Sequence, residues 1–590
     1  MFSLWRPLCL YATIYRYPQI SRVTHSKDGP ASLCALHKNF KPHVTIQRCH
    51  SSHLVKDARH EGFKTHHGLF IKRGDTVELE DGNFIQVLKV LNREFDNKYW
   101  IVGWRFARNG ETHGLPRHDD PNEVHWVVHL AKNDPRPARE QALEEVEDSQ
   151  IRRKRTMKMV NTTYLGHRKK NGAPLGAPSD GALFCRWKHV ICTRTPKRHR
   201  PLDAFTIPAA EITEASFQRL RIGECDDGHN IRIADEPLRR SWRGVTKKGG
   251  AGIDSKETSS LLSAFEALSL YDNSENKRTS AAYTFADVCC GAGGASRGAE
   301  MAGLHLCWAL DHNAAACESY SLNFSEVQLH HKEIKDVVNM QGEGLKVDIL
   351  HLSPPCQAFS PARTHPNVEN DLVNIAANME LGNCLDVAKP RIATLEQTSG
   401  LMSGGYVGGR HHEYWVKVIE QFTSRGYSVA WKIMKLAELG LPQPRERLIM
   451  IASCPGEDLP HFPKPAHAKN PGKTGLQRFA SVKDAIGNIP IGCANHEIPS
   501  NLPTPREVYD ENEPLPGTIL TKRSFIAHPN GLRSFSLREL ACLQGFLLKH
   551  MFCGTEIMKQ IGNAFPPTVA AVLFGDIKLQ LLIRDGLNPL

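Results

Sequence analysis

The sequence predicts an α/β fold with a mostly parallel sheet in its second half and a smaller β-rich module in its first half. From Tyr283 onward, an apolar strand, a glycine-rich turn, a helix and a second strand follow one another. After Gly74, apolar residues alternate with polar ones on both sides of Asp81-Gly82, a turn signal that favours a hairpin. The first pattern is typical of nucleotide-binding α/β domains, and the second of small β domains.

The composition is that of a chain that buries sizeable cores. Its 590 residues are 41% apolar and 23% charged, and this length suggests about three or four domains. The 16 cysteines include no Cys-x-x-Cys pair, which argues against a disulfide framework or a zinc ribbon and for a reducing compartment. We therefore expect no metal site. The formal charge of +11 suits a polyanionic partner.

One cysteine is placed as a candidate nucleophile. The run from Leu352 to Ser360 reads Leu-Ser-Pro-Pro-Cys-Gln-Ala-Phe-Ser and follows the short apolar stretch 347–350. The two prolines stop the predicted strand, so Cys356 is expected in a stiff loop at the strand's carboxyl end, where open α/β sheets bind ligands. A structural thiol is the alternative for such a cysteine taken alone.

A cofactor site is predicted at the glycine-rich turn. Gly291, Gly293 and Gly294 let the backbone approach a nucleotide closely. The next strand ends at Asp311, about twenty residues after Gly291, where a carboxylate can bind the ribose hydroxyls of an adenosine cofactor. Both ends of an adenosine site are therefore indicated, whereas the identity of the cofactor stays open at this point.

Two further segments add charged residues to the predicted sheet. Residues 392–395 look like a buried strand that carries Glu396 at its carboxyl end. Arg445 and Arg447 alternate at the start of another strand, so both are expected to point to one face and to favour an anionic or carbonyl-rich substrate. A structural ion pair between Glu396 and Arg447 is the alternative.

In this order, the motifs resemble those of the cytosine-5 DNA methyltransferases over roughly residues 283–583. The matching segments are Asp287-Val-Cys-Cys-Gly-Ala-Gly-Gly, Ser353-Pro-Pro-Cys-Gln, Gln443-Pro-Arg-Glu-Arg, Arg538-Glu-Leu-Ala-Cys-Leu-Gln-Gly-Phe and Gln560-Ile-Gly-Asn-Ala-Phe-Pro-Pro. Chance agreement at all of them, in the family order, is implausible. The resemblance implies a Rossmann-like, S-adenosylmethionine-dependent methyltransferase domain that acts on double-stranded DNA.

The resemblance also implies a covalent mechanism. Cys356 adds to C6 of a cytosine, because C5 is a poor nucleophile until a thiolate has added to the ring. Glu396 stabilises the developing enamine at N3 and the exocyclic amine, Arg447 holds O2, and Arg445 belongs to the same catalytic group. This chemistry requires the base to leave the stacked duplex, at a cost of roughly a few kcal/mol.

S-adenosyl-L-methionine is the cofactor that the resemblance implies. Its predicted contacts lie in several segments of the catalytic half. They are Phe285, Asp287, Cys290, Gly291, Gly293 and Gly294 in the first strand and its loop, Asp311 and His312 after the second strand, Glu333 and Ile334 further on, and Pro354, Asn563 and Ala564 in the later motifs.

The sequence departs from the family pattern beside the catalytic carboxylate. The family's Glu-Asn-Val is here Glu396-Gln-Thr, so the amide of Gln397 that would brace the nucleophile loop stands on a stem one methylene longer. This triplet resembles the fungal RID-like subgroup, which is associated with premeiotic repeat silencing. In the cofactor site, Cys289 replaces an aromatic residue, Asp311 replaces Glu, and Glu333 replaces Asp.

Residues 281–453 and 531–590 are expected to form the catalytic core, with a target-recognition region at 454–530. Five cations of that region are expected to contact phosphates rather than bases: Lys464, Lys469, Lys473, Arg478 and Lys483. The last apolar segment, about 567–583, carries Asp576 and Lys578 and is expected to be a core helix. No membrane partner is therefore expected.

The first half of the chain is expected to hold a chromatin-binding module. The hairpin, a strand at 99–106 and the segment 182–187 resemble a bromo-adjacent homology (BAH) domain over residues 62–207, which implies a nucleosome or histone-tail partner. An aromatic cage of Tyr99, Trp100 and Trp104 would bind methylated lysine, but packing of these rings in the core is the favoured interpretation.

The segments around this module are expected to serve connection and targeting. Residues 208–280 should form a linker with helices at 211–221 and 255–271, and residues 1–61 a disordered or targeting segment. The basic clusters 152–155 and 197–200 favour nuclear import or phosphate binding, and hence the nucleus. A mitochondrial presequence is the minor alternative, because residues 1–27 carry Arg6, Arg16, Arg22 and Lys27 and no acid.

We expect DNA cytosine C5 methylation in genome defence, repeat silencing or heterochromatin, and two other readings stay open. One is a silencing protein that binds chromatin through its β module and has a catalytically weak methyltransferase fold, because Gln397 departs from the family. The other is an RNA cytosine-5 methyltransferase of the same fold. The tRNA-directed members are usually short and carry a Cys-Phe-Thr motif, which this chain does not contain.

Overall fold

The computed structural model describes residues 61–93, 98–116, 122–162, 181–196, 202, 207, 211–228, 231–244, 283–360, 368–402, 411–521 and 526–587. The predicted N-terminal targeting segment up to residue 60, the basic cluster 197–200 and the predicted helix at 255–271 lie outside these residues.

The catalytic half is built on a mixed sheet. Its strands are β12 (Thr284–Val288), β13 (His305–Asp311), β14 (Gln328–His331), β15 (Ile349–Leu352), β16 (Ile392–Gln397), β17 (Ser428–Lys435) and β18 (Glu446–Ser453), in the spatial order β14-β13-β12-β15-β16-β18-β17. The strands from β14 to β16 pair in parallel, and β18 is antiparallel to both neighbours. The carboxyl ends of β12, β13, β15 and β16 therefore meet at one edge of the sheet.

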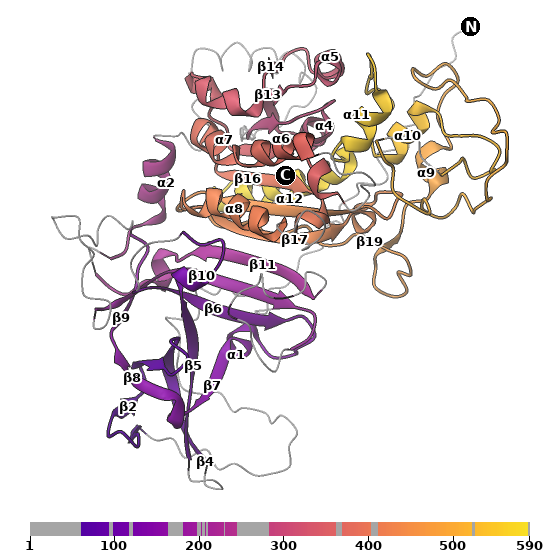
Figure 1. The fold of residues 1–590 in the computed structure, drawn as a ribbon. Coiled ribbons are helices and arrows are strands. Elements are labelled where there is room, and N and C mark those ends of the chain that lie inside the picture. Colours follow the sequence, from indigo (N-terminus) through magenta and orange to yellow (C-terminus); the bar gives the residue numbers. More distant parts are fainter. Residues whose placement is uncertain are drawn as a thin grey trace, which may run out of the picture. The chain divides into compact units, whose positions relative to one another are not determined.

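Helices cover both faces of this sheet (Figure 1). On one face, α7 (Leu381–Ala388) and α8 (His411–Thr423) share a buried core with β15 and β16. On the other face, α4 (Gly294–Met301) and α12 (Pro567–Arg584) pack together over Phe285 and Ile349. α5 (Ala314–Asn323) follows β13, and α6 (Val368–Asn378) lies between the nucleophile loop and α7 in the sequence.

The last helix is a core helix, as predicted. By length and composition alone, residues 557–584 would also be long and apolar enough to cross a membrane, a test that core helices of soluble proteins also pass. This stretch is divided between α11 (Ile557–Asn563) and α12, with a break before Pro567. Phe574, Ile577 and Leu581 of α12 are fully buried against the sheet.

The region between β18 and α10 (Leu537–Leu543) has little regular structure (Figure 1). Its elements are β19 (His467–Ala468), β20 (Gln477–Arg478) and α9 (Val482–Ile486). Val482, Leu515 and Ile519 join α10 and α11 in a separate small core. The loops of this region are therefore anchored to the two helices that carry the last two motifs.

The N-terminal half is β-rich. Its elements are β1 (Gly62–Lys64), β2 (Phe70–Lys72), β3 (Thr76–Leu79), β4 (Phe84–Arg93), β5 (Lys98–Arg108), β6 (Glu123–Ala131), α1 (Ala138–Gln141), β7 (Leu143–Glu147), β8 (Ile151–Arg155), β9 (Met157–Met159) and β10 (Leu183–Thr193). The predicted hairpin is confirmed, because β3 and β4 pair in antiparallel fashion and Gly82 takes a φ of +82° in the turn between them.

Two aromatic residues of β5, Trp104 and Tyr99, pack against other rings of the β-rich half rather than around a cage. Trp104 is buried, with its ring 4.8 Å from that of Trp126. Tyr99 stacks on Phe63 at 4.7 Å. The core interpretation is therefore confirmed for Trp104 and Tyr99.

The predicted helix at 211–221 is wrong, because β11 (Ile212–Arg219) is a strand. It pairs with β10 on one side and with β17 on the other, where Phe217 lies opposite Val429. Glu211 and Gln218 favour a helix when read locally, but hydrogen bonding on both edges and the burial of Phe217 override that preference. One hydrogen-bonded sheet therefore runs through the β-rich half and the catalytic half.

A helix after β11 joins the two halves further. α2 (Asp235–Arg243) ends at Arg243, which is buried and donates to the main-chain oxygens of Lys389 at 2.8 Å and Val347 at 3.0 Å. Its guanidinium also lies 3.3 Å from the Asp348 carboxylate. Asp348 in turn accepts hydrogen bonds from Thr284, the first residue of β12. Arg243 therefore ties the amino ends of the two central strands to the N-terminal half.

Candidate active site

The nucleophile loop begins where β15 ends. The main-chain N–H of Ser353 still donates to Val288 of β12 at 3.1 Å, and the two prolines then turn the chain away from the sheet. Cys356 follows them and directly precedes a short 3-10 turn, Gln357–Phe359. The predicted placement of Cys356 after the carboxyl end of its strand is confirmed.

The charged residues around Cys356 have opposite effects on the pKa of its thiol. Burial and the Glu396 carboxylate raise the pKa of the Cys356 thiol, whereas Arg447 and Arg445 lower it. The structure thus brings together all four predicted catalytic residues, which come from the β15 loop, β16 and the start of β18. A positive charge near a thiol favours the thiolate, which is the nucleophilic form.

Glu396 and Arg447 form an ion pair. Arg447 Nε lies 2.6 Å from Glu396 Oε1, and both side chains are largely buried. The ion pair between Glu396 and Arg447, predicted as an alternative from the sequence, is therefore present, and it lies near the Cys356 thiol. It fixes the orientation of the carboxylate and sets a positive charge next to it.

Arg445 also hydrogen-bonds two segments outside the β18 strand. Its guanidinium donates to the main-chain oxygens of Ile519 at 3.2 Å and Gly562 at 3.0 Å, and the side chain is buried. Ile519 belongs to the loop region after β18, and Gly562 to α11. Arg445 therefore contributes charge near Cys356 while it fastens the loop region and α11 to the start of β18.

The amide of Gln397 contacts the nucleophile loop from β16. Its Nε2 lies 3.3 Å from the Pro354 oxygen and 3.4 Å from the Pro355 oxygen, while its Oε1 accepts from Thr398 N at 2.7 Å. These two contacts to the loop are long for N–H···O hydrogen bonds. The longer stem of Gln397 thus still reaches the loop, but it bonds each carbonyl weakly.

A second amide side chain, that of Asn378, also contacts the nucleophile loop. Asn378, at the end of α6, donates through Nδ2 to the Pro355 oxygen at 3.1 Å, and its Oδ1 accepts from Gln397 at 3.3 Å. Both amide side chains are fully buried. The sequence alone did not single out Asn378, because nothing in a lone asparagine at a helix end indicates a partner on a distant strand.

The cofactor loop after β12 is organised by Asp311. Its Oδ2 accepts from Gly291 N at 2.8 Å and its Oδ1 from Asn313 N at 2.8 Å. Gly293 has a φ of +89°, and a Cβ there would lie 2.4 Å from the Phe324 ring. The turn therefore requires glycine at 293 for both its backbone conformation and its packing.

Residues of the last motif, Ala564 and Phe565, lie next to the cofactor loop. A Cβ on Gly294 would lie 2.4 Å from the Phe565 oxygen and 3.2 Å from Ala564 Cβ. The predicted cofactor residues Gly294 and Ala564 are therefore neighbours, although 270 positions separate their numbers. Asn563, also predicted, is exposed at the end of α11.

Phe285 lies on the face of β12 that α12 covers, and its role as a cofactor contact stays a prediction. Its ring is buried and packs edge-on against Phe574 of α12 at 4.9 Å. Residues two apart in a strand share a face, so Asp287 also points toward α4. There its Oδ2 accepts from Ser296 Oγ at 2.7 Å, and burial raises the pKa of Asp287 to about 7. Asp287 therefore stabilises the start of α4, directly after the cofactor loop.

The remaining predicted cofactor residues lie around the same sheet edge. Cys290 packs in a small core with Tyr320 of α5 and with Phe324, the residue after this helix. His312 is exposed, with Nδ1 3.8 Å from Asp311 Oδ1. Glu333 is exposed just after β14, whereas Ile334 is buried in the core and Pro354 is buried in the nucleophile loop.

The fold and this site define a class of protein. A glycine loop and a strand-end carboxylate, beside a cysteine held with a buried Glu–Arg pair, fit an enzyme that binds an adenosine cofactor and attacks its substrate through a thiol. In the part of the chain that the structure describes, no group of three His, Cys, Asp or Glu side chains is arranged to hold a metal ion.

Comparisons with known proteins give the family. Residues 283–498 match the family C-5 cytosine-specific DNA methylase. The type II methyltransferase M1.HphI of Haemophilus parahaemolyticus is 27% identical over 335 residues, which cover 49% of this chain and 85% of that protein. The type II methyltransferase M.XorII of Xanthomonas oryzae pv. oryzae is 33% identical over 35% of this chain and 46% of its own length.

A vertebrate relative shows the same match over a smaller share of its length. DNA (cytosine-5)-methyltransferase 1 of Mus musculus is 28% identical over 257 residues, which cover 36% of this chain and 15% of that protein. Residues 283–498 therefore form a region similar to the C-5 cytosine DNA methyltransferases, and the protein is a DNA (cytosine-5-)-methyltransferase whose methyl donor is S-adenosylmethionine. The turn at Gly291, where a Cβ would meet no atom within 4 Å, and the Asp311 carboxylate fit such a cofactor.

Proposed function

We propose that Cys356, Glu396 and Arg447 carry out methylation of a cytosine flipped out of double-stranded DNA. The observation that supports this is the buried pair of Glu396 and Arg447, 2.6 Å apart, beside the only cysteine that follows two prolines at a strand end. No other cysteine in the sequence has this setting.

In the proposed reaction, the Cys356 thiol loses its proton and Sγ forms a bond to C6 of the cytosine. The electrons of the C5–C6 double bond move toward C5, and the Glu396 carboxyl accepts a hydrogen bond from the exocyclic amine and, when protonated, donates one to N3, which stabilises the enamine. Arg447 holds Glu396 through Nε and binds O2. When bound, S-adenosylmethionine supplies the electrophilic methyl group. Once C5 carries the methyl group, its proton leaves to water, the C5–C6 double bond forms again, and the bond between Sγ and C6 breaks to restore the Cys356 thiolate.

The ion pair assists the first of these steps. The Glu396 carboxylate raises the pKa of the thiol, so its negative charge opposes thiolate formation. Arg447, 2.6 Å away, partly neutralises that charge. A hydrogen bond from the cytosine amine to Glu396 would reduce the effect of the carboxylate on the thiol further. Binding of the target base thus makes the thiolate easier to form at the moment when it is needed.

We infer that Gln397 and Asn378 position the nucleophile loop. Both amides contact the Pro355 oxygen, one residue before Cys356, and they also bond each other. Thr398 N fixes the orientation of the Gln397 amide. In this proposal the RID-like triplet is an alternative packing solution in which two weak contacts replace one stronger one.

The wider role is inferred from resemblance. The Glu-Gln-Thr triplet and the BAH-like β-rich half support genome defence, repeat silencing or heterochromatin, with a nucleosome or histone tail as a partner. The nucleus is the expected location, and a mitochondrial location is the alternative. A fluorescent fusion of the full chain distinguishes the two, because mitochondrial import would remove the signal from the nucleus.

A methylation assay on defined duplexes, read by bisulfite sequencing, tests the proposed activity. We expect new 5-methylcytosine in double-stranded DNA and none in an RNA of the same sequence. Methylation of the RNA alone would favour the RNA methyltransferase reading. Binding to DNA without methyl transfer would favour the catalytically weak chromatin-binding reading, which the long Gln397 contacts also support.

A further inference from the structure

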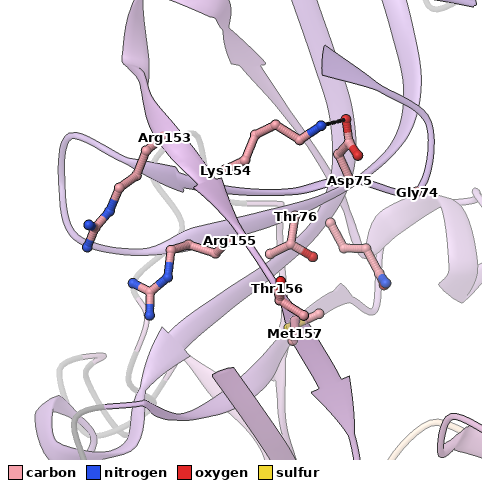
Figure 2. Close-up of a pocket in the computed structure, with 9 residues that line it drawn as sticks. Gly74, Asp75, Thr76, Arg153, Lys154, Arg155, Thr156 and Met157 are labelled. Atoms are coloured by element: carbon pink, nitrogen blue, oxygen red, sulfur yellow. Dashed lines mark ion pairs between the residues drawn. The ribbon is translucent and has the colours of Figure 1, made fainter. Parts of the chain in front are cut away.

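The basic cluster predicted for nuclear import or phosphate binding lies on strand β8, where its side chains pair within the sheet. Figure 2 shows Lys154 extending to Asp75, and their charged atoms lie 2.8 Å apart. Arg153 and Arg155 bond the buried Glu78 of β3 at 2.9 Å and 2.7 Å. These contacts connect β8 to its neighbours in the sheet, and a role of the cluster in import or phosphate binding stays a prediction.

A buried histidine of the catalytic half has partners of a different kind, because they belong to the active site. His351 on β15 lies opposite Thr394 on β16, and its Nδ1 is 2.8 Å from Thr394 Oγ1. Its Nε2 is 2.7 Å from the hydroxyl oxygen of Ser353, the first residue after β15. His351 therefore bonds β16 with one ring nitrogen and the base of the nucleophile loop with the other.

Both partners of His351 precede a reacting group in their own segment. Thr394 lies two positions before Glu396 on β16, and residues two apart in a strand point to the same side. The main-chain N–H of Ser353 donates to β12 at 3.1 Å, and it is the last main-chain donor before Cys356 because the two prolines between them have no N–H. His351 thus holds the side chain of the residue at which the loop leaves the sheet.

The orientation of the His351 ring is fixed by burial. The ring is fully buried, stacks on Phe565 with centroids 5.4 Å apart, and meets Phe574 edge-on at 5.5 Å. Burial lowers the pKa of His351 to about 3, so the ring is neutral and has one N–H donor and one acceptor. Two hydroxyl groups satisfy both, since each can donate or accept. A rotated ring would leave buried nitrogen atoms without hydrogen bonds, which is unfavourable.

We propose that His351 is a positioning residue that acts through Ser353 to hold the base of the nucleophile loop, and so keeps Cys356 at a fixed position relative to Glu396. The inference rests on the proposed roles of Cys356 and Glu396. It adds a contact on the near side of the two prolines to the two amides that contact the proline carbonyls.

A simpler explanation is that His351 only fills space in the core. That explanation accounts for the contacts with Phe565 and Phe574, which an apolar ring would make equally well. It does not require a polar ring on a buried parallel strand, where apolar residues suffice. Nor does it require two hydroxyl partners that lead to the reacting carboxylate and the reacting thiol.

His125 on β6 provides a matched control. It is also fully buried, and burial lowers its pKa to about 3. Its Nε2 lies 3.3 Å from Thr112 Oγ1 and its Nδ1 3.2 Å from Asn109 Oδ1. These partners belong to the β-rich half, in segments that carry none of the proposed reacting groups.

The test uses the full chain and four variants. Ser353→Ala removes the hydroxyl that His351 binds, and Ser353→Thr keeps it. His351→Phe keeps a ring for the contacts with Phe565 and Phe574 but removes both hydrogen bonds, and His125→Phe makes the same change in the control. Two rates are measured: single-turnover methyl transfer at saturating S-adenosylmethionine, and formation of the covalent complex with a duplex that carries 5-fluorocytosine. Dissociation constants for the cofactor and for DNA, and the midpoint of thermal unfolding, are measured for each variant.

We expect Ser353→Ala and His351→Phe to lower both rates by about tenfold to a hundredfold, because a displacement of about 1 Å has that scale of effect. Both dissociation constants should stay close to wild type. Ser353→Thr should keep most of the rate. The double variant of Ser353→Ala and His351→Phe should lose little more than His351→Phe alone, since the two residues act through one hydrogen bond. His125→Phe should lower the unfolding midpoint and leave both rates unchanged.

Unchanged rates in Ser353→Ala, or an equal loss of rate in His125→Phe, would overturn the proposal and leave His351 as a core residue. A loss explained by weaker binding of cofactor or DNA would overturn it as well. If His351→Phe does not fold, the comparison of Ser353→Ala with Ser353→Thr decides. A wild-type chain that forms no covalent complex through Cys356 would refute the proposed function itself, whereas a wild-type complex with unchanged rates in Ser353→Ala refutes only the role of His351.

Discussion

The two loops that meet at the sheet edge are held by different kinds of contact. The cofactor loop is bonded to the Asp311 carboxylate, which accepts from Gly291 N of that loop at 2.8 Å and is itself oriented by Asn313 N at 2.8 Å. The nucleophile loop is held by neutral amides at 3.1–3.4 Å. Charge-assisted hydrogen bonds are shorter and stronger than neutral ones. The cofactor loop is therefore the stiffer of the two, although the chain departs from its family beside both loops, at Asp311 and at Gln397.

The largest effect is expected from Cys356→Ser. A serine hydroxyl is a far weaker nucleophile at neutral pH, so methyl transfer should be abolished while S-adenosylmethionine binding and folding stay close to wild type. Single-turnover transfer of a labelled methyl group measures this, with Cys307→Ser on β13 as the control. A serine enzyme that retained a substantial fraction of the rate would refute the covalent mechanism.

Glu396→Gln should lower the chemical step by roughly two to four orders of magnitude, the usual range for general acid catalysis. The change keeps the shape of the side chain but removes the charge that pairs with Arg447. Affinity for DNA should change little. Loss of S-adenosylmethionine binding with an intact DNA step would place Glu396 in the cofactor site instead.

Asp311→Asn tests the stiffer loop. The amide keeps one acceptor but loses the other and the charge, so the loop around Gly291 should weaken its hold on the cofactor. We expect the dissociation constant for S-adenosylmethionine to rise by roughly tenfold to a hundredfold, the scale of a hydrogen bond to a charged group. The single-turnover rate at saturating cofactor should stay near wild type. A fall in that rate with unchanged cofactor affinity would remove the distinction between the loops.

Gln397→Asn tests the softer loop and should have a smaller effect. The shorter stem withdraws the amide from carbonyls that Gln397 reaches only at 3.3–3.4 Å. The rate should fall by up to about a hundredfold, because a displacement of about 1 Å has that scale of effect. Asn378→Ala should act in the same direction, and the double variant should lose less than the product of the two, since both amides share one carbonyl. A rate increase in Gln397→Asn would indicate a decayed position and a protein that acts mainly by binding.

The sequence predicted the parts of the fold that local pattern determines. The strands that lead to Cys356 and Glu396 follow from apolar runs with clear ends, and the hairpin follows from Asp81-Gly82. β11 was misread, because its two pairing partners come from different halves of the chain. Local propensity carries no information about such partners.

The site was predictable to a similar extent. The four catalytic candidates come together because their motifs follow strand ends, whose position in a parallel sheet is fixed by topology. The packing of Phe285 on Phe574 could not be predicted, because the motif does not say which face of β12 a side chain takes. Asn378 could not be found, since its contact with Gln397 depends on how the end of α6 lies against β16.

Covalent trapping tests the central claim most directly. The wild-type chain is incubated with S-adenosylmethionine and a duplex that carries 5-fluorocytosine, whose fluorine cannot leave as the C5 proton does. We expect a denaturation-resistant complex of protein and DNA, with the modified peptide containing Cys356 and with no such complex for Cys356→Ser. Methyl transfer to normal DNA without a trapped complex, or a complex through another cysteine, would contradict this account.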